Sequence, residues 1–240
     1  MSIIQALKRS VGVLGALLFA SGALAQSPAG QWEMSISGKV LGASAIGIAY
    51  IEILDDGSLE GFAEIRGGSS LLTVSGSWTG SGSGLFGSLS VTSELFGDRS
   101  YEFIGTFRDG RSVSMSCFNG DGDRIRIAGR PAVEIPDCSG VYLGSMRQYG
   151  LWGVLEVTVV STEYPGLYEL GGLLLLGGQA FDLAGHAVVN RRGSFVANLE
   201  NLTSESLAIS SVWGSIRPGQ RLSGVGLDIF DGSAIRFSLR

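Results

Sequence analysis

Side chains with oxygen atoms alternate in the stretch "FNGDGDRIRIAGR" at 118–130, where Asn119, Asp121 and Asp123 are separated by single residues. A helix-flanked calcium loop places its first three ligands in this way, but it also needs a glycine at position 6 and a glutamate at position 12. Counted from Asn119, both of those positions are arginines. We therefore interpret the stretch as the turn of a β-hairpin and expect no metal site there.

Two further patterns lack the structural setting that their chemistry needs. His186 is the only histidine, and Asp182 lies four residues earlier, about 13 Å away along an extended strand, so the two side chains are not expected to pair. Gly82, Gly84 and Gly87 satisfy the GxGxxG pattern of dinucleotide-binding proteins, which requires a helix after the last glycine. An alternating segment, "SLSVTS", follows instead, so neither His-dependent catalysis nor dinucleotide binding is predicted.

Carboxylates are the remaining catalytic candidates. Pairs of them could meet across neighbouring strands, as the paired acids of glycoside hydrolases do. The sequence alone does not say which of them meet, so a carboxylate-dependent hydrolase stays an alternative. The candidates are Glu52, Glu60, Glu64, Glu156 and Glu169.

Four tryptophans suggest a second kind of site. A tryptophan near the first strand of a closed barrel usually fills one end of the core, and its other use is to line an apolar cup for a lipophilic ligand or a sugar face. We take the four as candidate ligand-lining residues. They are Trp32, Trp78, Trp152 and Trp213.

The segment 1–25 has the features of a secretory signal peptide. Lys8 and Arg9 precede an apolar run at 11–20, and "SGALAQ" supplies small residues for cleavage before Gln26. The run is shorter than the roughly 20 residues that a membrane-spanning helix needs. We therefore expect an exported protein, periplasmic or extracellular.

The two cysteines are expected to form a disulfide, because an exported chain meets an oxidising environment. A Cys117 to Cys138 bond would close a loop of about 20 residues and contribute roughly 3 kcal/mol to stability. With one histidine and one cysteine pair, the chain has no thiolate or imidazole cluster for zinc or haem, so no cofactor is predicted. The net charge of −5 gives no support to nucleic-acid binding.

The rest of the chain shows the two-residue period of half-buried strands. In "RSVSMSCF" at 111–118 apolar residues alternate with serines, and in "SAIRFSLR" at 233–240 they alternate with serine and arginine. Short turn signals such as "DDG" at 55–57 and "RDG" at 108–110 separate such runs and leave no room for crossover helices. The sequence therefore predicts an all-β protein built mostly as an antiparallel meander.

An internal repeat divides the chain. "DGDRIRIAGR" at 121–130 aligns with "DGSAIRFSLR" at 231–240. We predict a β domain at 26–130, a proline-bearing connector at 131–139 and a duplicate domain at 140–240. Each accommodates about eight strands, which favours two small closed barrels in tandem. A β-sandwich and a single larger barrel are the alternatives.

These observations favour an exported, non-enzymatic binding or structural module that holds a small apolar ligand. "GQW" at 30–32 is similar to the early Gly-x-Trp of the lipocalin and avidin families, which also have an eight-strand meander, but three residues assign the chain to neither. An outer-membrane β-barrel is the main alternative, because apolar-in and apolar-out strands alternate identically in sequence. The carboxylate-dependent hydrolase is the second alternative.

Overall fold

The structure, a computed structural model, describes residues 27–93, 97–108, 110–203 and 209–240. The regular elements of these residues are all β-strands. A helix long and apolar enough to cross a membrane does not occur in the described part of the chain. The predicted signal peptide at 1–25 lies outside the described residues, so export remains a prediction.

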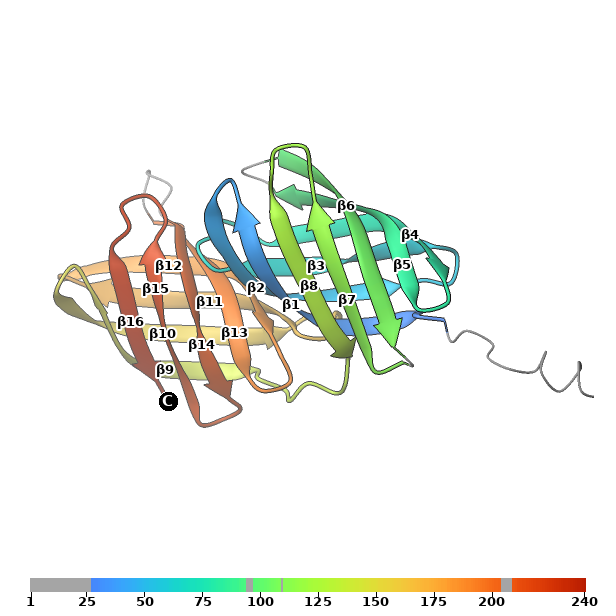
Figure 1. Cartoon of the computed structure of the whole chain (residues 1–240). Helices are drawn as coiled ribbons and strands as arrows, with labels where there is room; N and C mark the ends of the chain where they lie inside the picture. Colours follow the sequence, from blue (N-terminus) through green and yellow to red (C-terminus); the bar gives the residue numbers. More distant parts are fainter. Residues whose placement is uncertain (1–26, 94–96, 109, 204–208) are drawn as a thin grey trace, which may run out of the picture.

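The first half of the chain forms a closed antiparallel barrel (Figure 1). Each strand pairs with the next in sequence, and β1 closes the sheet by pairing with β8 as well as with β2. The strands are β1 Gly30–Val40, β2 Ala43–Ile53, β3 Ser58–Ile65, β4 Leu72–Ser81, β5 Gly84–Ser93, β6 Gly97–Arg108, β7 Ser112–Phe118 and β8 Arg124–Pro131.

The second half repeats this topology, and its first strand, β9, pairs with both β10 and β16. The two barrels keep the spacing of the sequence repeat, because β9 follows β1 at the same interval as β16 follows β8. The strands are β9 Gly140–Gln148, β10 Leu151–Ser161, β11 Leu167–Leu176, β12 Gln179–Val189, β13 Ser194–Asn201, β14 Ile209–Arg217, β15 Arg221–Asp228 and β16 Ala234–Leu239.

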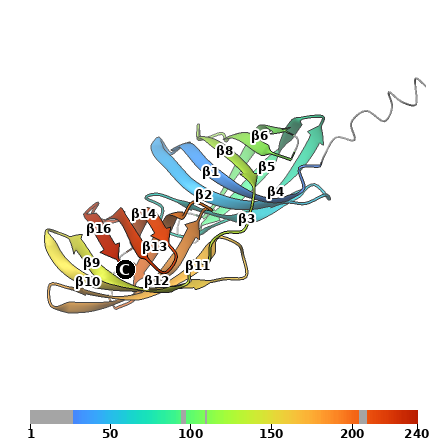
Figure 2. The same cartoon turned by 90° about the horizontal axis from the view of Figure 1, so that it is seen from below.

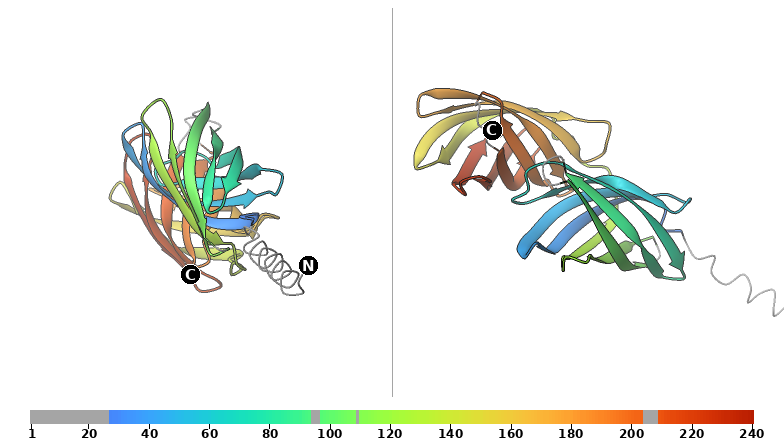
Figure 3. Two further views of the ribbon diagram at one scale, coloured as in Figure 1. Left: turned by 45° about the vertical axis from the view of Figure 1, so that its right-hand side comes forward. Right: turned by 90° about the horizontal axis from the view of Figure 1, so that it is seen from above.

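Two closed eight-stranded barrels in tandem confirm the predicted fold class (Figures 1 and 3). The β-sandwich and the single larger barrel, which the sequence also allowed, are wrong. A sheet of eight strands closes when its first and last strands pair, so no edge is left for further strands to extend.

Alternation along each strand separates the inside of a barrel from its outside. In β1, Trp32, Met34 and Ile36 are buried in the N-terminal core, whereas Ser35 and Ser37 are exposed.

Glycines allow the strands to coil tightly. At Gly61 a Cβ atom would lie 2.0 Å from the carbonyl oxygen of Tyr50, so a larger residue would force the β2–β3 pair apart.

The expected Cys117 to Cys138 disulfide is not formed, and both thiols are free. Cys117 belongs to the hydrophobic core of the N-terminal barrel, and Cys138 belongs to that of the C-terminal barrel. The prediction was wrong because each cysteine acts as a small buried hydrophobic residue of its own barrel. Burial raises the pKa of the Cys117 thiol to about 12 and also raises that of Cys138.

Both thiols should therefore be inert in the folded protein. Without denaturant, a thiol-alkylating reagent at pH 8 should leave Cys117 and Cys138 unmodified, and in concentrated urea it should label both, because only the thiolate reacts. Intact-mass measurement counts the labels. A protein that is two hydrogens lighter and takes no label in urea would instead contain the disulfide.

The two barrels meet side by side, β2 and β3 of the first packing against β12 and β13 of the second (Figures 1 and 2). Tyr50 and Phe62 on the outer face of the N-terminal barrel pack with Val188 and Val196 of the C-terminal barrel. The Tyr50 hydroxyl donates a hydrogen bond of 2.9 Å to the carbonyl oxygen of Val189. A hydrophobic cluster with specific polar contacts thus holds the barrels together.

One ionisable group is fully buried in this interface. The Asn198 amide donates to Oε2 of Glu64, while Oε1 of Glu64 and Oδ1 of Asn198 have no partner among the described residues. Burial raises the pKa of Glu64 well above its ordinary value. A proton on Glu64 supplies a donor, and the free Oδ1 of the same amide is an acceptor, so the neutral acid satisfies the pair best.

Glu64 should make stability depend on pH. The pKa of Glu64 is higher in the folded protein than in the unfolded chain. Its contribution to the free energy of unfolding is therefore fully present below the unfolded pKa near 4.5 and is lost as the pH rises, by at most about 1.4 kcal/mol per pH unit. Glu64→Gln keeps the shape without the charge and should flatten the fall in unfolding free energy between pH 5 and pH 8, measured by urea denaturation. The exposed Glu156→Gln serves as control and should keep the wild-type slope. Equal slopes for all three proteins would contradict a protonated Glu64.

Candidate ligand-binding site

The N-terminal barrel contains a cavity of about 360 Å³ that opens at the end of the barrel where the β1–β2 and β3–β4 turns lie. This volume is within the range of small-molecule binding sites. Its walls are mainly inward side chains of the barrel, from seven of its eight strands. They include Ile36, Ala45, Ala49, Ile51, Ala63, Val74, Leu89 and Ile127.

Small side chains create this space. Ala49 of β2 lies opposite Ala63 of β3, and both are buried and line the cavity. This pair lies two residues from Gly47. Two facing alanines leave unfilled the volume that two larger side chains would take.

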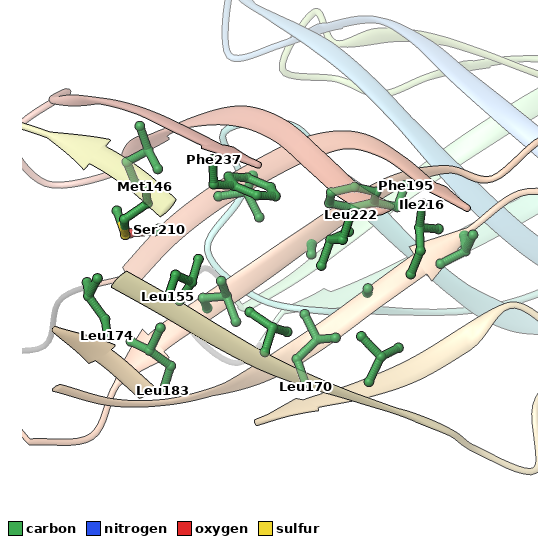
Figure 4. A pocket seen from close by; sticks show the side chains of 18 of the residues that line it. Met146, Leu155, Leu170, Leu174, Leu183, Phe195, Ser210, Ile216, Leu222 and Phe237 are labelled. Atoms are coloured by element: carbon green, nitrogen blue, oxygen red, sulfur yellow. The ribbon is translucent and has the colours of Figure 1, made fainter. Parts of the chain in front are cut away.

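The C-terminal barrel has larger inward residues on its second and third strands. Leu155 of β10 lies opposite Leu174 of β11, and both point into the interior (Figure 4). The cavity that remains there is about 70 Å³, room for only a few water molecules. The N-terminal barrel is therefore the one with space for a ligand.

Asp123 organises the mouth of the N-terminal cavity. Its carboxylate is 2% exposed and accepts hydrogen bonds from the Leu41 amide at 2.7 Å, Asn119 Nδ2 at 3.0 Å, and Arg99 Nη1 and the Tyr101 hydroxyl at 3.2 Å each. Three chain segments, the β1–β2 turn, β6 and the β7–β8 turn, are thereby tied together. Burial opposes ionisation, but these hydrogen bonds and the Arg99 charge together lower the pKa of Asp123 below its ordinary value.

The stretch at 118–130 thus contains a turn, and its Asp123 forms hydrogen bonds that connect segments of the barrel. Oδ1 of Asn119 accepts hydrogen bonds from the amides of Asp121 and Asp123, and Asp121 is exposed. Among the described residues no group of three or more His, Cys, Asp or Glu side chains is placed to hold a metal ion. The side-chain oxygens of Asn119 and Asp123 accept hydrogen bonds from other groups of the protein rather than pointing toward a common metal position.

Two of the four tryptophans are structural. Trp32 is 3% exposed, its indole N–H donates to the Pro28 carbonyl at 2.8 Å, and its ring meets Phe107 edge-on at 5.9 Å between centroids. Trp78 is half-buried and donates to the Leu54 carbonyl at 3.0 Å. Neither is among the residues that line the cavity.

The other two tryptophans lie outside the barrels. Trp213 is at the interface between the barrels, 5.6 Å from the guanidinium carbon of Arg66. Trp152 is 69% exposed and packs beside Arg147 on the outer face of the C-terminal barrel. The residues that line either barrel cavity include neither of them.

The strand register brings together one pair of the five candidate glutamates. Glu52 lies opposite Glu60 on β2 and β3, in a groove of about 450 Å³ whose other wall holds Tyr164 and Leu167. Both acids stand on the same wall, and the described residues of the opposite wall include no acid. Glycosidic cleavage needs two carboxyl groups that flank the scissile bond, and the described residues of this groove do not place two acids on opposite sides of a substrate.

The remaining motifs have ordinary positions. His186 is exposed on β12, opposite Glu169 on one side and Asn198 on the other. Gly82 lies in the β4–β5 turn, and Gly87 lies within β5 rather than before a helix. Neither motif forms the constellation that its chemistry would need.

Sequence reasoning overlooked the residues that shape the cavity. Ala45, Ala49 and Ala63 are inconspicuous in a chain rich in small residues, and Arg66 and Arg99 at the mouth carry no motif. The alternation in "ASAIGIAYIEI" at 43–53 was the available signal, since alanine and glycine occupy successive inward positions there. A row of small inward residues in a barrel strand indicates space.

Replacing the mouth carboxylate should destabilise the protein. Asp123→Ala removes four hydrogen bonds and leaves the Arg99 charge half-buried and without its nearest partner, so the free energy of unfolding should fall by about 3 kcal/mol. Asp121→Ala, at a side chain that is 70% exposed, should change it by less than about 0.5 kcal/mol. Both differences, measured by urea denaturation, should be the same with and without added calcium. If the difference in unfolding free energy between variant and wild type depended on calcium, the turn would bind metal.

Comparisons with known proteins assign no family. No protein-family model matches the sequence, and no curated protein matches it. Among solved structures, the chain is similar to isotype 1 transferrin binding protein B from serogroup B Neisseria meningitidis, with a TM-score of 0.30 and 9% sequence identity over 88% of this chain and 62% of that one. The chain thus spans less than two thirds of that protein, and a likeness of this size carries no conclusion about function.

Proposed function

We propose that this protein is a non-enzymatic binding module that holds a small apolar ligand in its N-terminal barrel. The observation that carries the proposal is the 360 Å³ cavity beside a second barrel of the same topology that is nearly filled. Packed interiors rarely contain voids larger than a water molecule. An apolar cavity of this size inside a closed barrel is typical of a ligand site.

The predicted export signal supports a periplasmic or extracellular location for this binding. A small apolar molecule is poorly soluble in water, so a barrel that shields it from solvent suits a compartment in which it must be carried or retained. This location rests on the residues before Gln26 and belongs to the proposal.

Membrane insertion, the main alternative, is less well supported. A transmembrane barrel carries a continuous apolar band outside, whereas the outward residues of β1 include Ser35, Ser37 and Lys39. The outer face of the C-terminal barrel does carry Val154 beside Leu175, but charged Glu156 and Asp182 interrupt that face. The apolar side of both barrels is mainly the inside.

Filling the cavity should weaken binding strongly without unfolding the barrel. The double variant Ala49→Leu with Ala63→Leu reproduces the facing leucines of the C-terminal barrel. It should bind dodecanol, used as a neutral apolar probe, at least tenfold more weakly than wild type in isothermal titration. Its unfolding free energy should stay within about 2 kcal/mol of the wild-type value, because the new methyl groups enter empty space.

The matched control is Ala180→Leu, which adds the same volume at an exposed position of β12. It should bind the probe as wild type does. If wild type takes up no dodecanol, or if the filled variant binds it equally well, the cavity is not the site.

A further inference from the structure

The described residues that line the N-terminal cavity include two arginines, Arg66 and Arg99, and no acidic residue. The described lining of the C-terminal cavity contains no charged residue at all. The protein as a whole has a net charge of −5. Among the described residues, arginines therefore line only the cavity of the barrel that has room for a ligand.

One of these two charges is compensated. Nη1 of Arg99 lies 3.2 Å from the buried carboxylate of Asp123 and 3.8 Å from that of Asp121. Arg99 therefore serves mainly to neutralise Asp123, a charge that would be costly to bury alone.

Arg66 has no such partner. It is exposed at the start of the β3–β4 loop, and no carboxylate of the described residues forms an ion pair with it. Glu64, two residues earlier, is turned into the barrel interface and bonded to Asn198. The Arg66 guanidinium lies instead by the ring of Trp213, 5.6 Å from its centroid.

The location of Arg66 is fixed by the surrounding backbone. Its amide donates to the Ile46 carbonyl at 2.8 Å, and the next amide, that of Gly67, donates to the hydroxyl of Ser211 at 2.8 Å. Contact with an aromatic ring leaves the N–H groups at the edge of a guanidinium free to bind an anion. The loop thus presents, at the mouth of an apolar cavity, an arginine that has no carboxylate partner in the described part of the chain.

We propose that the ligand is a single-chain amphiphile with an anionic head group, its hydrocarbon chain inside the N-terminal barrel and its head group bound by Arg66. This inference rests on the proposed function and specifies the ligand class. Hydrophobic burial of the chain supplies the affinity. The charge-assisted contact with Arg66 selects an anionic head over a neutral or cationic one.

The test compares three probes with the same twelve-carbon chain on the mature protein: dodecanoate, dodecanol and dodecyltrimethylammonium. At pH 8, where the carboxylate is ionised, wild type should bind dodecanoate about fivefold more tightly than dodecanol and the cationic probe most weakly. Arg66→Gln should remove the preference, so that the affinities for dodecanoate and dodecanol become about equal. High salt should weaken that preference as well.

The control is Arg126→Gln, which removes the same charge from an exposed position on β8 that does not line the cavity. It should keep the wild-type preference. Equal binding of dodecanoate and dodecanol by wild type would overturn the inference, and so would an equal loss of the preference for dodecanoate in the two arginine variants. Neither result would contradict the proposed site for an apolar ligand. Failure of wild type to bind any of the three probes would overturn the proposed function itself.

Discussion

The interior of an eight-stranded barrel has little more room than its own side chains need, and this constraint decides what each half of the molecule can do. The two barrels share strand number, order and closure. They differ in inward residues of their second and third strands, which include the facing pair Ala49 and Ala63 in one barrel and the facing pair Leu155 and Leu174 in the other. The same topology thus yields a cavity of about 360 Å³ in one and about 70 Å³ in the other.

Such a division of roles is consistent with a duplicated barrel. A filled barrel gains apolar burial and stability, whereas a hollow one gives up part of that gain for space. The two barrels pack against each other through the interface around Tyr50 and Phe62. Glu64 and Asn198 stabilise this interface only while Glu64 is protonated, because a buried acid is favourable only with its proton and its partner in place.

The sequence predicted the architecture better than the site, for a physical reason. Alternation, turn residues and the repeat are local patterns, and they were sufficient for strands, antiparallel order and two barrels. Whether two alanines face each other depends on strand register, as does the pairing of Glu52 with Glu60. The prediction of a disulfide was wrong for a related reason. The spacing of Cys117 and Cys138 along the chain did not reveal that they belong to the cores of different barrels.

The mouth of the cavity and the barrel interface are parts of one structure. Arg66 and Gly67 line the cavity, and the same two residues contact Trp213 and Ser211 of the second barrel. Any displacement of the β3–β4 loop by a head group at Arg66 must therefore alter contacts between the barrels. Because such coupling is reciprocal, the proposed ligand would bind more or less readily according to how the C-terminal barrel packs against this loop.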